Sequence, residues 1–276
     1  MKKYLDNNFD PGELVEVFDE LPLWSAPFGL KLLETVDYKL GITALDIGFG
    51  TGFPLTELAM RLGGSSRVYG IDPWKAAIDR VRRKIAFYGL QNITIFEGVA
   101  EAIPLEDHSI DLIVSNNGLN NVQDMDKVLS ECSRISKPGA QLVMTMNLDK
   151  TMYEFYDQLE IILMENGLEK EIKSMHRHIY EKRRPLNEVV TLLKANGFTI
   201  KNVEHAMFKY HFADGSAMLN HYFIRMAFMD SWVKILPVEM VDALFGNIEE
   251  RLNNIAGKAG VLKLSIPFVV TNAYKY

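Results

Sequence analysis

The spacing of apolar residues changes along this chain. Between residues 43 and 147, short and mainly apolar runs, typical of buried strands, occur at 44–47, 67–71, 93–96, 110–114 and 141–146. The segments between these runs carry apolar residues three and four positions apart, which predicts helices over 54–62, 75–88 and 124–136. Strands that alternate with helices in this way favour a parallel sheet covered on both faces.

The second half of the chain combines two further strands with helical segments. We predict the strands near 198–212 and 261–274, with helical insertions near 150–184 and 214–258. Residues 152–167 hold more large apolar side chains than the single stripe of a surface helix, so this segment is expected to be buried on more than one side. We find no linker or repeat that suggests an independent second domain.

Composition narrows the class of protein. The chain has 276 residues, 48% of them hydrophobic, and a net charge of −6, so no overall positive field favours DNA or an anionic membrane. The single cysteine, Cys132, excludes an internal disulfide framework and a multi-cysteine zinc site. The chain start lacks the apolar run of a signal peptide, and charged residues interrupt the best candidate span, Leu219 to Leu236. We therefore expect a cytoplasmic protein with no transmembrane span.

The stretch from Ala44 to Phe53 is the most informative part of the sequence. It begins as a strand and then places glycines at alternate positions, Gly48, Gly50 and Gly52. Glycines in a turn between strand and helix let a ligand approach the backbone closely, because no Cβ intervenes. Asp46, two residues before the first glycine, is expected either to orient the loop or to receive a cationic ligand group.

The glycine spacing differs from the G-x-G-x-x-G of dinucleotide folds, because Phe53 stands where a third, more distant glycine would be. The acid followed by G-x-G-x-G resembles motif I of the class I S-adenosylmethionine (SAM)-dependent methyltransferases. Another nucleotide-binding protein and a purely structural turn remain as alternatives at this point.

A second acidic residue closes the next predicted strand. Asp72 lies 20 residues beyond Gly52, where a carboxylate can accept hydrogen bonds from both hydroxyls of a ribose. Pro73 and Trp74 follow, and Trp74 could lie against an adenine face. The alternative is that Asp72 caps the following helix and that Trp74 packs on it.

Three later stretches extend the resemblance over about 45–150. They are G-V-A-E-A-I-P-L from Gly98, D-L-I-V-S-N from Asp111 and K-P-G-A-Q-L-V-M from Lys137. In order and spacing they are similar to landmarks of the type 11 group of small-molecule methyltransferases, which includes quinone-biosynthesis C-methyltransferases. The resemblance implies a Rossmann-like α/β fold: a seven-stranded, mostly parallel sheet that ends in an antiparallel hairpin, with helical lid insertions.

The resemblance also implies SAM as cofactor, S-adenosylhomocysteine as product, and a set of contacts. The implied cofactor-binding residues are Asp46, Gly48, Gly50, Thr51, Gly52, Asp72, Pro73, Trp74, Ala100, Glu101 and Asn116. Two departures stand out: Val99 replaces a common aspartate, so adenine recognition would depend on backbone or on Glu101, and Leu119-Asn120-Asn121 replaces leucine-histidine-histidine. A histidine-assisted mechanism at 120 or 121 is therefore in doubt.

We divide the chain into a helical leader over the cofactor mouth (1–40), a SAM-binding core (41–149) and the remainder of the sheet with its lid insertions (150–276). The leader should contain helical pieces at 14–18 and 28–33, with an extended or turn-like segment at 21–27 between them because of its two prolines. Apolar and Met-rich residues in the insertions suit either an adaptable pocket or a lobe core or dimer face. The candidate acceptor contacts are Trp24, Asn120, Tyr153, Tyr156 and Met226.

These patterns predict in-line transfer of a methyl group to a small, largely apolar acceptor, with a homodimer possible. An acidic nucleophile would need a base, for which His176, His178 and His211 are weak candidates; no metal-ligand spacing is visible. Two alternatives remain. One is an RNA or protein methyltransferase that docks through the basic stretch Lys170–Arg184, and the other is a non-catalytic SAM-binding sensor or assembly module.

Overall fold

The computed structural model describes Leu5, Val15 and residues 23–276 of the chain. The described residues fall into two compact units. The sheet unit comprises Val15 and residues 23–147, with Arg184–Ala206 and Phe268–Tyr276; the helical unit comprises Leu5, Leu148–Arg183 and Met207–Pro267. Except for Leu5 and Val15, the first 22 residues of the leader lie outside the described residues, and with them most of the helix predicted over 14–18.

Seven strands form one sheet in the order β3-β2-β1-β4-β5-β7-β6. β1 to β5 pair in parallel, and β7 runs antiparallel to β5, with Gln141 opposite Tyr274. The predicted class, a mostly parallel seven-stranded sheet that ends in an antiparallel hairpin, is confirmed. The strands are β1 (Thr43–Ile47), β2 (Arg67–Asp72), β3 (Ile93–Glu97), β4 (Ile110–Asn116), β5 (Ser136–Asn147), β6 (Phe198–Phe212) and β7 (Leu262–Lys275).

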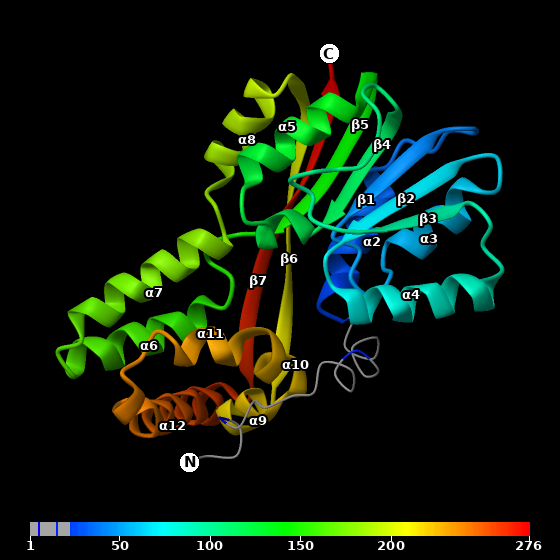
Figure 1. Ribbon diagram of the computed structural model, residues 1–276. Helices are drawn as coiled ribbons and strands as arrows, with labels where there is room; N and C mark the ends of the chain where they lie inside the picture. Colours follow the sequence, from blue (N-terminus) through cyan, green and yellow to red (C-terminus); the bar gives the residue numbers. More distant parts are fainter. Residues whose placement is uncertain (1–4, 6–14, 16–22) are drawn as a thin grey trace. The chain divides into compact units, whose positions relative to one another are not determined.

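Helices cover both faces of the sheet within the sheet unit. Figure 1 shows α3 and α4 on one side and α5 and α8 on the other. The helices of this unit are α2 (Ser25–Thr35), α3 (Leu55–Leu62), α4 (Lys75–Tyr88), the 3-10 turn η2 (Gly118–Asn121), α5 (Met125–Ile135) and α8 (Leu186–Ala195). Because both faces are covered, the central strands carry an almost continuous apolar core, with Leu45, Ile113 and Val143 each at most 1% exposed.

Two local predictions differ in part from the structure. The segment 21–27 was expected to be extended or turn-like; Leu23 and Trp24 form a turn, but α2 begins at Ser25 and includes Pro27. Proline is tolerated in a first helical turn, where the backbone N–H groups have no partner within the helix. β5 begins at Ser136, five residues before the predicted start, because Ser136 pairs with Ile110 ahead of a β-bulge.

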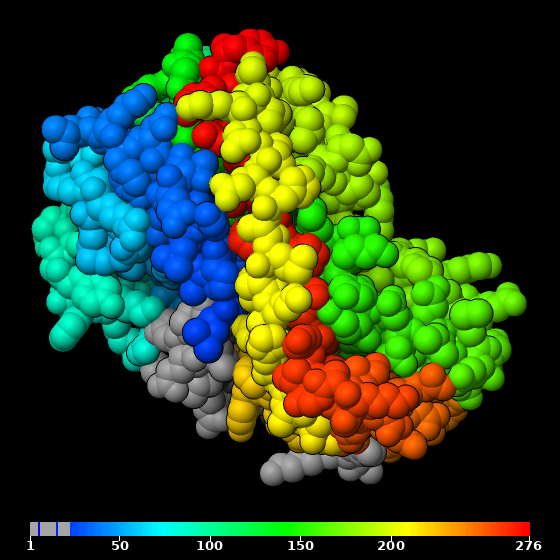
Figure 2. All heavy atoms as spheres, turned by 180° about the vertical axis from the view of Figure 1, so that it is seen from behind, coloured from blue at the N-terminus to red at the C-terminus, as the bar shows by residue number. Residues whose placement is uncertain are grey.

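β6 is one of the two edge strands of the sheet and spans the residues predicted for it, 198–212. Its burial alternates between exposed and partly buried residues, and Figure 2 shows it, in yellow, along the surface. On its sheet-unit part, Glu204 forms an ion pair with Lys31 of α2 at 3.2 Å. An edge strand that is half-exposed carries many polar residues, so its sequence resembles that of a loop.

The helical unit has its own aromatic core. Its elements are α6 (Tyr153–Glu165), α7 (Glu169–Lys182), α9 (Gly215–Asn220), α10 (Tyr222–Ile224), the π-helical turn η3 (Arg225–Met229), α11 (Asp230–Val233), the 3-10 turn η4 (Val238–Met240) and α12 (Val241–Ala259). Phe155 stacks on Trp232 with ring centroids 3.8 Å apart, and both side chains are fully buried. The prediction that 152–167 is buried on more than one side was wrong, because the buried residues of α6 are spaced three and four apart on one face, whereas Tyr153, Ile161 and Met164 are exposed. A lid role for these helices stays a prediction.

No helix among the described residues has both the length and the apolar composition needed to cross a membrane.

Candidate functional site

A cavity of about 700 Å³ lies at the carboxyl ends of β1, β2 and β4, in the sheet unit. This is the edge at which open α/β sheets bind ligands. Its walls come from the start of α2, the glycine loop after β1, the end of β2 with the residues that follow it, α4, the turn after β3 and the segment after β4.

The glycine loop presents bare backbone to this cavity. Gly50 has φ 52° and lines the cavity, and a Cβ built on it would meet no protein atom within 4 Å. Gly48, with φ 76°, donates its N–H to the Ile71 carbonyl at 2.9 Å; a Cβ there would lie 2.8 Å from the Cα of Gly118. Glycine at 48 thus permits the close approach of two loops, whereas glycine at 50 leaves space for a ligand.

Asp72 holds this loop in place. One carboxylate oxygen accepts the Gly50 N–H at 2.8 Å, and the other accepts the Trp74 N–H, also at 2.8 Å. Asp72 is 6% exposed, and burial raises the pKa of its carboxyl above the ordinary value, although the two N–H groups act in the opposite direction. Each oxygen retains a lone pair that can accept a hydroxyl from the cavity side.

Asp46 differs from Asp72, because it is fully buried beneath the loop and does not line the cavity. Burial, and then the charge of Asp72, raise the pKa of its carboxyl well above the ordinary value. The Leu55 N–H offers a partial contact, yet neither carboxylate oxygen completes a hydrogen bond within the described part of the chain. Of the two roles left open for Asp46, orientation of the loop fits this position better than direct contact with a ligand.

Most of the other predicted cofactor residues meet at the cavity. Gly48, Gly50, Thr51, Asp72, Pro73, Trp74, Ala100, Glu101 and Asn116 line it, and Asp46 and Gly52 do not. The Glu101 carboxylate is already engaged, because it accepts the N–H groups of Gln123 and Asp124 at 2.9 and 3.1 Å. This engagement favours backbone contacts for adenine. The assignment of these residues to the cofactor stays a prediction.

α2 forms a wall of the cavity through Trp24, Ser25 and Ala26. Asn116 donates its side-chain N–H to the Ser25 carbonyl at 3.1 Å, which ties the start of α2 to the end of β4. A Cβ at Gly29 would lie 2.1 Å from Phe53 Cε1, so α2 contacts the end of the glycine loop there.

Lys84, which lies in a run of charged residues on α4, was not among the predicted site residues. It lines the cavity, and its ammonium donates to the Thr51 carbonyl at 2.8 Å. The spacing contained the signal: Lys84 is three residues after the buried Val81 and thus lies on the same helix face.

The candidate acceptor contacts are divided between the units. Trp24 lines the cavity, whereas Asn120 does not; its amide donates to the side-chain oxygens of Asn147 and Asn117. In the helical unit, Tyr153 is 43% exposed, Tyr156 is buried and Met226 is half-buried. Contact of these residues with an acceptor stays a prediction.

The three candidate bases belong to the helical unit and have different surroundings. His176 is exposed and pairs with Glu160 at 2.9 Å, and His211 is exposed. Burial, followed by the positive charges of Arg183 and Lys182, lowers the pKa of His178 to about 4. A histidine with so low a pKa is neutral at pH 7 but is a weak base. Among the residues with described positions, no group of His, Cys, Asp and Glu side chains is arranged to hold a metal ion.

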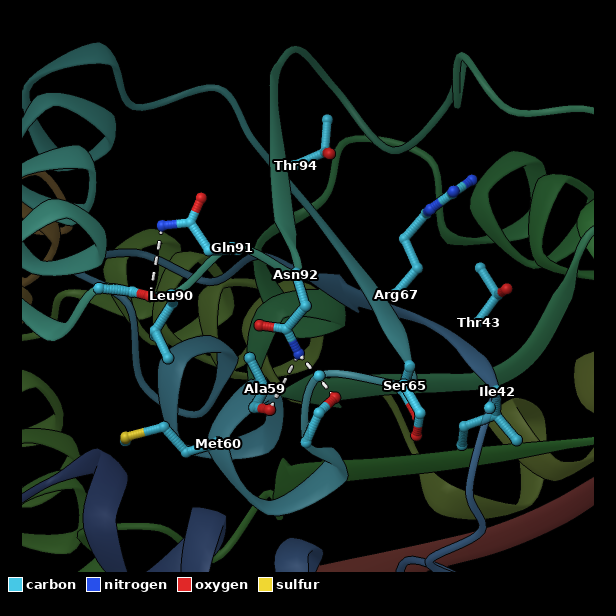
Figure 3. A pocket seen from close by; sticks show the side chains of 15 residues that line it. Ile42, Thr43, Ala59, Met60, Ser65, Arg67, Leu90, Gln91, Asn92 and Thr94 are labelled. Atoms are coloured by element: carbon cyan, nitrogen blue, oxygen red, sulfur yellow. Dashed lines mark hydrogen bonds between the residues drawn. The ribbon is translucent and has the colours of Figure 1, made fainter.

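A second, larger hollow of about 850 Å³ lies at the opposite edge of the sheet, where β1, β2 and β3 begin. Figure 3 shows Asn92 there, with its amide donating to the carbonyls of Ala59 and Gly63. Arg67 is the charged residue of its lining, and none of the predicted site residues lies in it. Because ligands bind at the carboxyl edge in this type of sheet, the smaller cavity is the candidate site.

Comparison with known proteins identifies relatives of the sheet unit. Residues 45–144 match the family model described as "Methyltransferase domain". The demethylmenaquinone methyltransferase of Shouchella clausii is 32% identical over 130 residues, which are 45% of this chain and 55% of that protein. The chain thus spans about half the length of this curated relative.

Two solved structures share the fold. A SAM-dependent methyltransferase from Aquifex aeolicus matches with a TM-score of 0.51 at 23% identity, over 71% of this chain and 92% of that one. Geranyl diphosphate C-methyltransferase from Streptomyces coelicolor, in complex with S-adenosylhomocysteine, matches with a TM-score of 0.56 at 15% identity, over 91% and 76% of the two chains. Residues 45–144 are thus similar in sequence to a methyltransferase domain, and the chain shares its fold with these two solved structures.

Proposed function

We propose that this protein is an enzyme that transfers a methyl group from SAM to a small, largely apolar acceptor. The observation that carries the proposal is the cavity at the carboxyl edge of the sheet, where the open Gly50 backbone faces the carboxylate of Asp72. The named activities of the relatives, on demethylmenaquinone and on geranyl diphosphate, support an acceptor of this class.

The residues present fit SAM. Asp72 would accept the ribose hydroxyls, and the space beside Gly50 would admit the cofactor at the backbone. Trp74 and Ala100 would flank the adenine. When bound, the cofactor supplies a methyl group activated by a sulfonium leaving group.

The protein's own contribution to such a reaction is alignment and exclusion of water. Asp72, Lys84 and Asn116 fix the loop, the helix and the strand end that border the cavity, so that the site is formed before ligands bind. Holding two reactants in line can lower a barrier by roughly 7–11 kcal/mol. A general base is needed only for an acidic nucleophile, and none of the three histidines is placed in the cavity lining.

One observation counts against docking of RNA or protein through Lys170–Arg184. Arg183 is 2% exposed, and Arg184 pairs with Glu188 and Asp126, so one of the six cations in this stretch is buried and a second is already paired within the protein.

The test is transfer of labelled methyl from SAM into separated fractions of a cell extract. The proposal predicts label in the organic-solvent fraction, and only with active protein. Label in RNA or protein would support the docking alternative, and SAM binding with no label in any fraction would support a non-catalytic module. The possible homodimer is tested by the mass of the protein in solution.

A further inference from the structure

Arg183, at the end of α7, is a buried cation with no anionic partner among the described residues. Its side chain is 2% exposed, and its Nε and Nη1 make no hydrogen bond to any residue that the structure describes. A guanidinium cannot lose its proton in a protein, so Arg183 does not escape the cost of burial by becoming neutral. A buried charge of this kind is normally paired.

The contacts around Arg183 within the helical unit compensate its charge only in part. The guanidinium carbon lies 5.1 Å from the centroid of the Tyr156 ring, a cation–π contact. Arg183 also follows the last turn of α7, where the carbonyl ends of the helix favour a cation. Neither contact uses the Nε and Nη1 donors, for which the described part of the chain offers no acceptor.

Aromatic rings lie close to Arg183. The Tyr156 hydroxyl accepts the indole N–H of Trp232 at 3.0 Å, and the Tyr156 ring lies 6.4 Å from the ring of His178. Trp232 and Phe155 stack behind Tyr156. The cluster therefore combines the planar donor fork of an arginine with a polarisable aromatic wall, which suits an oxyanion attached to an apolar body.

We propose that Arg183 and Tyr156 form an anion site that binds the carboxylate or phosphate group of a small apolar ligand, with His178 beside it. That this ligand is the methyl acceptor rests on the function proposed above; the anion site itself does not. The acceptor class would then be narrowed from apolar molecules to amphiphilic molecules with one anionic end.

The experiment compares charged and neutral probes of one shape by calorimetry. Benzoate and phenyl phosphate are expected to bind at least tenfold more tightly than benzamide. The anion that binds more tightly shows whether the site prefers a carboxylate or a phosphate group. Arg183→Met should weaken binding of the anions at least tenfold. Arg177→Met, which removes an exposed arginine from the same helix, should leave it within twofold. Equal binding of benzoate and benzamide, or unchanged benzoate binding in Arg183→Met, would overturn the proposal.

Two further measurements, SAM binding and the NMR titration of His178, test the anion site independently of methyl transfer. SAM binding should be the same in Arg183→Met as in the unaltered protein. If the unaltered protein does not bind SAM, the proposed function is contradicted, but the anion site is not. If Arg183→Met does not fold, the His178 ring signal of the unaltered protein decides by NMR. A bound anion should raise the pKa of His178 from about 4, because it offsets the charge of Arg183. A pKa that does not move when benzoate is saturating would refute the site.

Discussion

Asp72 accepts the Gly50 N–H at 2.8 Å and so joins the end of β2 to the middle of the glycine loop. The bond places a carboxylate and an open stretch of backbone on the same wall of the cavity. It also shows that the two readings of Asp72, structural and ligand-binding, are compatible: each carboxylate oxygen uses one lone pair on the protein and keeps another for a hydroxyl.

Gly50→Ala should weaken SAM binding more than it affects stability. The added Cβ meets no protein atom but enters the space that the cofactor would use, so we expect at least a tenfold loss of affinity. The positive φ costs roughly 1–2 kcal/mol of stability. Gly89→Ala is the matched control, since Gly89 has φ 66° and equally open surroundings but lies outside the cavity. Equal SAM affinities in both variants would show that the loop is not the cofactor site.

Gly29→Ala should be destabilising, although alanine usually stabilises a helix interior. Its Cβ would lie 2.1 Å from Phe53 Cε1, and relief of such overpacking costs roughly 1–3 kcal/mol. Because Phe53 also lines the cavity, displacement of its ring should weaken SAM binding as well.

The control is Gly257→Ala in α12, where a Cβ meets nothing within 4 Å and where we expect a gain of about 0.5–1 kcal/mol. Urea denaturation measures both variants. A Gly29→Ala protein as stable as the unaltered one would contradict the described packing of α2 on Phe53.

Much of this site was predictable because its signals are local in sequence. Three glycines at alternate positions and an acid at the end of the next strand define the loop and Asp72, and the parallel sheet brings them to one edge. Long-range pairings were not predictable. The engagement of Glu101 by Gln123 and Asp124, and the 2% exposure of Arg183 within a basic stretch, depend on tertiary contacts that charge patterns do not encode.

Lys84→Met should loosen the glycine loop. The ammonium donates to the Thr51 carbonyl, and loss of this bond should reduce SAM affinity by about fivefold, which corresponds to about 1 kcal/mol. Arg82→Met removes a cation from the exposed side of α4, where Arg82 pairs with Asp79, and should leave SAM affinity unchanged. If both variants bind SAM equally well, Lys84 does not position the loop.

Asp46→Asn should change how stability depends on pH. The folded-state pKa of Asp46 is raised, so the folded protein holds this proton more tightly than the unfolded chain does. Its contribution to stability is therefore present at low pH and is lost as pH rises through the folded-state pKa. The asparagine variant lacks this loss, and its free energy of unfolding should fall less between pH 4 and pH 7. A pH dependence identical to that of the unaltered protein, measured by urea denaturation at several pH values, would contradict the assigned shift.

The central claim is that the cavity beside Asp72 and Gly50 binds SAM, and calorimetric titration of SAM and S-adenosylhomocysteine tests it most directly. We predict micromolar binding of both and no heat with NAD. In Asp72→Asn the amide N cannot accept a backbone N–H, so affinity should fall by a factor of about 10 to 150, the equivalent of roughly 1.5–3 kcal/mol. Asp79→Asn, an exposed change on α4, should bind as the unaltered protein does. Absence of SAM binding, or equal affinity in Asp72→Asn, would contradict the account.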